Sequence, residues 1–237
     1  MLVTIKRKNL MMFSIVFAVI LIFVITFSTI KNSYKSPLKI GITVIIDAGH
    51  GGIDSGTSGI NTGIKESDLN LSVAKELQIY FNTVEINTVM TRDTSGGLYG
   101  STSKGFKSRD MAKRKDIING AKPDLVISVH MNKYPQSYRQ GAQAFFVKNS
   151  ENSQLAAKKV QFALNKEINK RAYEALVGDY YILNCTNYVS ILVECGFLSN
   201  AEDEALLATA EHRKKVAYQI FCGAMEYLTI TSYEKFM

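Results

Sequence analysis

Three segments with the pattern of buried strands end in side chains that can bind a metal ion or move a proton. Asp47-Ala48-Gly49-His50 closes the first segment, His130 the second and Glu194 the third. Ligands bind at the carboxyl ends of the strands in open α/β sheets, so these distant residues could converge on one site. The chain has 3 histidines, of which two hold such positions and His212 is expected at the surface. Two histidines with a glutamate favour metal-assisted or acid–base chemistry over a purely structural role.

A glycine-rich loop follows His50 directly. Six of the chain's 16 glycines fall between Gly49 and Gly63. The loop lacks the Gly-Lys-Ser/Thr ending of a P-loop and the G-x-G-x-x-G spacing of a dinucleotide site. We therefore expect a backbone that passes close around His50 and admits an extended substrate.

Hydrophobic periodicity predicts the elements that must position these residues. Predicted strands cover 42–47, 84–91, 125–130, 142–147, 180–183 and 189–194. Predicted helices cover 66–81, 110–120, 153–170, 202–207 and 211–228. Their alternation predicts an α/β fold with a mostly parallel central sheet flanked by helices.

Residues 10–30 predict a membrane anchor. They carry no charge, and at about 1.5 Å per residue a helix of this length spans roughly 30 Å, the thickness of a bilayer core. A cleaved signal peptide, which would release a secreted form, is the alternative, but Ser28-Thr29-Ile30-Lys31 is a poor cleavage sequence. Lys6, Arg7 and Lys8 precede the span, so the positive-inside bias places the N-terminus in the cytoplasm and the domain outside it.

The predicted organisation has five parts. They are a cytoplasmic basic tail (1–9), a transmembrane signal anchor (10–30), a linker (31–39), a catalytic domain (40–230) and a C-terminal tail (231–237). The formal charge of +7 resides almost wholly in the first 39 residues, which contain six basic and no acidic residues. The domain is nearly neutral, so the charge gives no support for a nucleic-acid partner.

Six sequence segments, in chain order, resemble those of the zinc-dependent N-acetylmuramoyl-L-alanine amidases. They are Asp47–Gly56, Glu66–Leu71, Thr91-Arg92, Arg114 with Asn119, Ser128–Asn132 and the closing motif Ile191–Asn200. The similarity runs from about Ile42 to Leu228, with Ala48 in place of the usual proline and Met131 in place of a small residue.

This resemblance implies a zinc amidase fold and assigns roles to four residues. His50, Glu66 and His130 would hold Zn²⁺, a His₂Glu set that leaves one position open for water. Glu194 would be the catalytic residue, acting as general base and then as general acid. Asp47, Asp54 and Asp68 remain alternatives as ligands, although turn or supporting roles suit them better.

The implied reaction is hydrolysis of the amide bond between N-acetylmuramic acid and L-alanine in peptidoglycan. As a small chain with a predicted anchor, this sequence resembles the spore-cortex type of the family, expected on the forespore or cortex side. The product of that type passes to a muramic-acid deacetylase on the way to muramic-δ-lactam. An accessory protein is a further expected partner. A general autolysin or division amidase is the alternative.

Two other classes of protein are weaker interpretations. A cysteine hydrolase would use Cys195, but the neighbour of Glu194 along a strand points to the opposite side of the sheet. A non-catalytic peptidoglycan-binding module would lack Glu194 or a ligand, and all four positions are filled. The odd number of cysteines, 3, argues against a disulfide framework and predicts buried free thiols.

Overall fold

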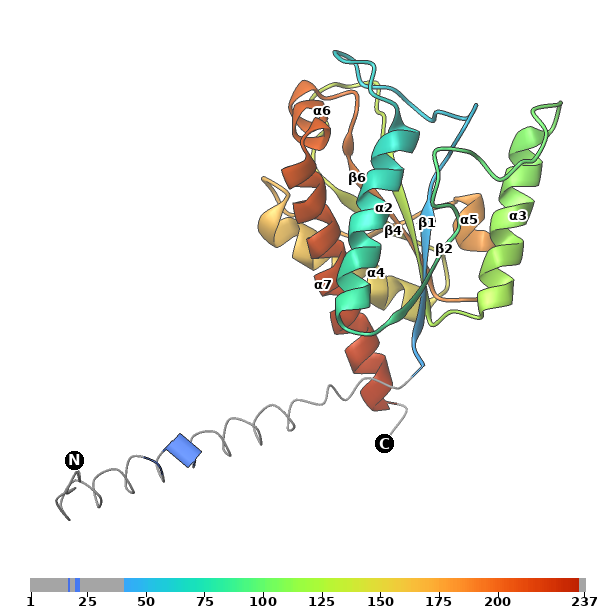
Figure 1. Ribbon diagram of the computed structural model, residues 1–237. Coiled ribbons are helices and arrows are strands. Elements are labelled where there is room, and N and C mark those ends of the chain that lie inside the picture. Colours follow the sequence, from blue (N-terminus) through green and yellow to red (C-terminus); the bar gives the residue numbers. More distant parts are fainter. Residues whose placement is uncertain (1–16, 18–19, 22–40, 235–237) are drawn as a thin grey trace, which may run out of the picture. The chain divides into compact units, whose positions relative to one another are not determined.

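A six-stranded sheet in the order β2-β1-β3-β6-β4-β5 forms the middle of the domain (Figure 1). The computed structural model describes residues 41–234 together with residues 17, 20 and 21. The strands are β1 (Thr43–Ala48), β2 (Asn87–Met90), β3 (Leu125–Asn132), β4 (Gln143–Phe146), β5 (Leu176–Val177) and β6 (Ser190–Phe197). Neighbouring strands run parallel in the part of the sheet formed by β2, β1, β3 and β6. Strand β4 then pairs antiparallel with β6. The predicted mostly parallel sheet is confirmed.

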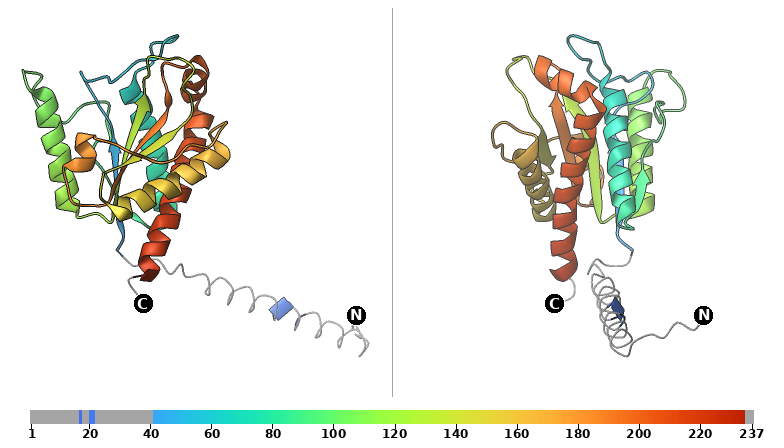
Figure 2. Two further views of the ribbon diagram at one scale, coloured as in Figure 1. Left: turned by 180° about the vertical axis from the view of Figure 1, so that it is seen from behind. Right: turned by 60° about the vertical axis from the view of Figure 1, so that its left-hand side comes forward.

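Helices cover both faces of the sheet (Figures 1 and 2). One face packs against α2 (Glu66–Thr83), α4 (Glu151–Glu167) and α7 (Ala210–Glu234). The other face packs against α3 (Phe106–Ala121) and the short α5 (Tyr181–Asn184). A further helix, α6 (Ala201–Ala208), leads into α7.

Alternation along the strands decides which side chains face the site. In β3, Val129 belongs to the large core under α2, α4 and α7, whereas Val126 belongs to the smaller core under α3 and α5. His130 has the parity of Val126, and in β6 Glu194 has the parity of Leu192, which also packs in the smaller core. Both chemistry-bearing residues therefore lie on the face of α3 and α5.

The prediction of a strand over residues 180–183 is wrong. These residues open helix α5, with Tyr180 at its N-cap and Ile182 and Leu183 buried in the smaller core. A four-residue apolar run is compatible with either a strand or a short helix, so its period could not decide between them. The last strand before β6 is instead the two-residue β5.

The ends of several other elements differ from their predicted positions by two or more residues, as α3, β2 and α7 illustrate. Helix α3 begins at Phe106, before the predicted start at residue 110, and β2 begins only at Asn87, after the predicted start at residue 84. Helix α7 continues to Glu234, into the predicted tail. The alternation of strands and helices is unaffected.

The predicted membrane anchor falls outside the described residues, apart from Phe17, Ile20 and Leu21. Among the helices that the structure does describe, none has the length and apolar character needed to cross a bilayer. The anchor and its orientation therefore stay predictions.

Candidate metal centre

His50, Glu66 and His130 bring their metal-binding atoms together at the carboxyl ends of β1 and β3, all within 4.8 Å of one another. Glu66 Oε1 lies 3.2 Å from His50 Nε2 and 2.9 Å from His130 Nδ1. In a tetrahedral site with metal–ligand distances of about 2.0–2.1 Å, two ligand atoms lie about 3.4 Å apart. The donor set and its spacing therefore fit a single zinc ion.

The sheet topology explains why these residues meet. The chain leaves β1 to form β2 on one side and returns to form β3 on the other. This reversal places a crevice between the carboxyl ends of β1 and β3, where α/β sheets bind ligands. Glu66 reaches the same crevice as the first residue of α2, and its Oε2 accepts a hydrogen bond of 2.8 Å from the Thr57 N–H.

Arg92 and Arg114 hold the backbone that carries His50. The Arg92 guanidinium donates to the carbonyls of Ala48 and Gly49 at 2.9 Å each. The Arg114 guanidinium donates to the carbonyl of His50 at 2.6 Å. Both arginines are buried, and His50 is held at a φ of 62°, which is uncommon for a residue other than glycine. Both arginines belong to the motifs that resemble the family, but their part in holding this loop could not be predicted from the sequence.

Asp47 balances the buried charge of Arg114. Its carboxylate accepts hydrogen bonds from the hydroxyls of Thr91 and Ser128 and pairs with the Arg114 guanidinium. Burial alone would raise the pKa of Asp47, but Arg114 and the two hydroxyls lower it to about 2. Asp47 therefore supports the loop and is not a metal ligand.

Electrostatics within the centre favour a charged carboxylate among the imidazoles. Burial would raise the pKa of Glu66, but contacts with His130 and His50 hold it well below its usual range. Burial would likewise lower the pKa of His50, but contacts with Glu66 and Asp54 outweigh it and raise the pKa. The lowered pKa of Glu66 keeps its carboxylate negatively charged between the two imidazole rings, and a negative charge at this position attracts a cation.

Two glycines of the loop leave room for the ligands. A Cβ at Gly49 would lie 2.2 Å from His130 Cε1, and one at Gly56 would lie 2.3 Å from Glu66 Oε2. Gly56 also has a φ of +66°. The backbone passes close to the ligands, as the sequence predicted, and it crowds His130 and Glu66 as well as His50.

Glu194 lies beside His130 because the two residues are register partners in β6 and β3. Its side chain is 6% exposed, and among the described residues its Oε2 has no hydrogen-bond partner. Burial raises the pKa of Glu194 to about 7, with the Glu66 charge adding to the rise and His130 opposing it. A carboxyl group of this kind can exchange a proton near neutral pH.

The centre lies in a cleft of about 480 Å³. Tyr99, Phe106 and Met111 form one wall, and Tyr180 with the other residues at the start of α5 forms a second. Lys107 and Lys133 also line the cleft. A cleft with aromatic and apolar walls around a charged metal position suits an extended substrate that presents a polar bond to the metal.

Other residues considered from the sequence lie apart from the centre. His212 is half-buried on α7, which packs against the opposite face of the sheet, and Asp68 is exposed. The Cys195 thiol is buried in the large core, and burial raises its pKa, so Cys195 is not the nucleophile of this cleft. Cys185 and Cys222 are free but only partly buried, so the prediction of three buried thiols is correct for Cys195 alone.

A carboxylate outside the centre holds the loop that precedes α2. Glu204 of α6 accepts hydrogen bonds from the backbone N–H groups of Asn61 and Thr62, at 2.9 and 2.8 Å. It also accepts from the Asn61 amide and the Thr62 hydroxyl. Burial would raise the pKa of Glu204, but these donors outweigh it and lower the pKa.

We expect Glu204→Ala to lower the free energy of unfolding by about 1–3 kcal/mol, because Asn61 and Thr62 lose a buried, charged acceptor. The lowered pKa means that Glu204 stabilises the fold above its unfolded pKa and that this stabilisation is lost as the pH falls through the folded pKa. Urea unfolding at neutral and acidic pH measures both effects. Glu202→Ala is the control, since its contact with Lys170 is exposed and contributes little. Equal effects of the two variants would contradict the assignment.

Metal-dependent hydrolases combine one metal position, three protein ligands and an adjacent carboxyl group. This site has the same features. Comparison with known proteins narrows this class. Residues 44–226 match the family model described as N-acetylmuramoyl-L-alanine amidase. The chain therefore belongs to the N-acetylmuramoyl-L-alanine amidase family and is an enzyme of that type.

Individual relatives agree with this assignment. The germination-specific N-acetylmuramoyl-L-alanine amidase of Bacillus subtilis is 31% identical over 232 residues, which cover 94% of this chain and 97% of the relative. The amidase LytC of the same organism is 28% identical, with 84% of this chain and 38% of the relative covered. Among solved structures, the CwlD amidase of Clostridioides difficile, determined in complex with the GerS lipoprotein, has a TM-score of 0.76 at 31% identity, covering 80% of this chain and 100% of that one.

Proposed function

We propose that this chain is a zinc-dependent amidase that cleaves the bond between N-acetylmuramic acid and L-alanine in peptidoglycan. The observation that carries the proposal is the convergence of His50 Nε2, Glu66 Oε1 and His130 Nδ1 beside the buried carboxyl group of Glu194. Membership of the family supports the reaction and the substrate class.

Each residue has a defined part in this reaction. His50, Glu66 and His130 hold the ion, and Glu194 moves the proton. Zinc bound there would polarise the amide carbonyl and lower the pKa of a water molecule to about 7. Glu194 takes a proton from the attacking water and delivers it to the departing L-alanine nitrogen, which leaves poorly unless it is protonated. Arg92 and Arg114 keep the His50 backbone in place throughout.

We expect the purified protein to hold about one zinc ion per chain and to lose activity when a chelator removes it. The measurement combines metal analysis with mass spectrometry of the muropeptides released from peptidoglycan by a chain lacking residues 1–35. Added zinc should restore release of the stem peptide, whereas a thiol alkylator should have no effect. Full activity after complete removal of metal from a folded chain would overturn the zinc assignment.

We further propose a role in the spore cortex, where removal of the stem peptide is the first step towards muramic-δ-lactam. The germination-specific relative supports this role because the match spans almost the full length of both chains. A muramic-acid deacetylase would act on the product. The complex of the Clostridioides difficile relative supports an accessory lipoprotein as a second partner. A general cell-wall role is the alternative, and the similarity to the amidase LytC supports it.

We also propose that residues 10–30 anchor the protein in the membrane with its domain on the extracytoplasmic side. A reporter fused after Met237 should then be active outside the cytoplasm, and the protein should stay with the membranes after a high-salt wash. Burial of apolar residues in the bilayer is not weakened by salt, which is the reason for the expected retention. Recovery of a soluble form that begins near Lys31 would identify a cleaved signal peptide instead.

A further inference from the structure

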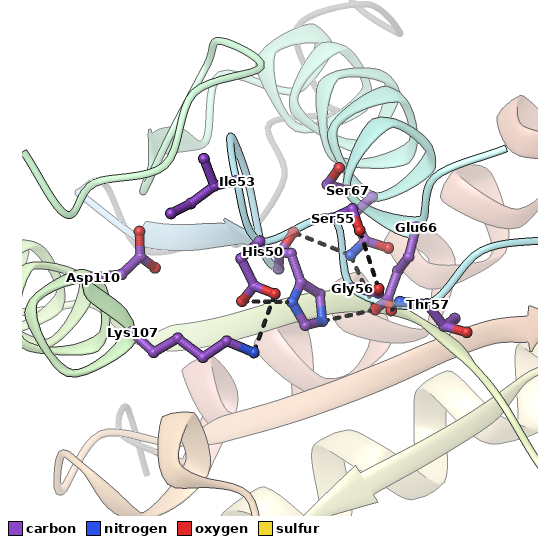
Figure 3. A network of polar contacts seen from close by, with 12 residues as sticks. His50, Ile53, Ser55, Gly56, Thr57, Glu66, Ser67, Lys107 and Asp110 are labelled. Atoms are coloured by element: carbon purple, nitrogen blue, oxygen red, sulfur yellow. Dashed lines mark hydrogen bonds and ion pairs between the residues drawn. The ribbon is translucent and has the colours of Figure 1, made fainter. Parts of the chain in front are cut away.

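We infer that Asp54 is the positioning residue that fixes the ring of His50 with Nε2 facing the metal position. This inference rests on the metal site of the proposed function and deepens it. The Asp54 carboxylate lies 3.0 Å from His50 Nδ1, while His50 Nε2 lies 3.2 Å from Glu66 Oε1 (Figure 3). A carboxylate can only accept, so the contact with Asp54 keeps a hydrogen on Nδ1 and leaves Nε2, which faces Glu66, as the nitrogen that can give its lone pair to a metal ion.

A tight turn in the loop after His50 brings Asp54 back beside the His50 ring. Gly51 and Asp54 exchange backbone hydrogen bonds of 2.8 and 3.2 Å, which close a tight turn. Gly52 within this turn has a φ of +61°, and its neighbour Ile53 donates its N–H to the Tyr99 hydroxyl at 2.9 Å. The carboxylate four positions after His50 is therefore placed beside the ring by fixed backbone.

His130 provides a contrast within the same site. Its Nδ1 faces Glu66, and its Nε2 lies 2.3 Å from where a Cβ of Gly49 would stand. In the described part of the chain, no second carboxylate pairs with this ring. Packing against Gly49 and against the His50 ring, whose centroid is 5.1 Å away, holds it in place. Loss of Asp54 should therefore loosen one ligand of the three.

Lys107 of α3 contacts the other oxygen of Asp54 at 3.3 Å (Figure 3). Its side chain is 66% exposed, so this ion pair contributes little to the position of Asp54. The turn and the bond to His50 carry the orientation, and Asp54 Oδ2 remains available to the ring.

The first test measures the zinc dissociation constant of the full chain by competition with a chromophoric chelator. Asp54→Ala should weaken zinc binding by about 10–100-fold, the usual cost of removing a carboxylate behind a metal-binding histidine. Asp54→Asn should fall between Asp54→Ala and the wild type, since an amide oxygen of the same size can still accept from Nδ1–H. Asp93→Ala removes an exposed carboxylate from a nearby loop and should leave zinc affinity unchanged.

The second test reads the tautomer of His50 directly. The chain has 3 histidines, so nitrogen-15 labelling of histidine gives a simple NMR spectrum. When the ring is neutral, His50 of the wild type should carry its hydrogen on Nδ1, and Asp54→Ala should lose this fixed tautomer. Unchanged zinc affinity in Asp54→Ala and Asp54→Asn, or weaker binding with the tautomer retained, would overturn the inference. Neither test uses peptidoglycan, so a chain that binds zinc normally but releases no stem peptide would overturn the proposed function alone.

Discussion

Replacement of Glu194 by glutamine is expected to leave zinc bound while lowering the rate of stem-peptide release by roughly 10²–10⁴-fold, the usual scale for loss of a general acid–base group. Glutamine keeps the size of the side chain but cannot take a proton from water. Glu194 is not one of the three converging ligands, so the metal position keeps its donors. Among the described residues Glu194 Oε2 has no hydrogen-bond partner, so the substitution breaks no hydrogen bond at that atom.

Zinc content and muropeptide release, measured on the same preparation, test this separation of roles. Glu202→Gln is a suitable control because it makes the same chemical change on an exposed part of α6. Loss of zinc from Glu194→Gln, or rescue of its activity by added zinc, would show that Glu194 is a ligand instead.

Replacement of either histidine of the metal centre, His50 or His130, is expected to abolish activity because the metal is lost. His50→Ala and His130→Ala each take away one of three donors, and the remaining two cannot complete a tetrahedral site with one water. Glu66→Gln is milder, because it replaces a charged oxygen ligand by a neutral one. Excess zinc should therefore partly restore Glu66→Gln, and it should not restore Glu194→Gln.

A zinc titration of all four variants, with metal content and activity measured at each point, distinguishes ligands from catalyst. His212→Ala is the control for loss of a histidine, since His212 lies on α7 away from the centre. Identical behaviour of Glu66→Gln and Glu194→Gln across the titration would mean that the two carboxylates do not have different roles.

The position of the metal centre could be predicted because the ends of buried strands can be recognised in the sequence. The runs before His50, His130 and Glu194 are apolar on both faces of the sheet, which is typical of central parallel strands. Glu66 was found only through the family resemblance, since nothing in its local pattern distinguishes it from an ordinary glutamate at the start of a helix.

Other parts of the site could not be predicted from local patterns. Arg92 and Arg114 each donate to the carbonyl of Ala48, which lies 44 and 66 positions away in the chain. Only the folded backbone shows these contacts. Helix α5 was missed because four apolar residues fit two periods equally well. Asp54 was one of three possible aspartates, and its distance to His50 separates it from the others.

The three ligands come from the loop after β1, the start of α2 and the end of β3, with Glu66 and His130 separated by 64 positions. A bound ion therefore acts as a non-covalent cross-link that closes long loops of the chain. It binds only when these segments are already assembled, so it stabilises the native state by mass action, by about 4 kcal/mol when the free ion is at 1,000 times its dissociation constant. If zinc is bound as we propose, metal supply would therefore set how long the domain persists against unfolding and proteolysis, in addition to whether it is active.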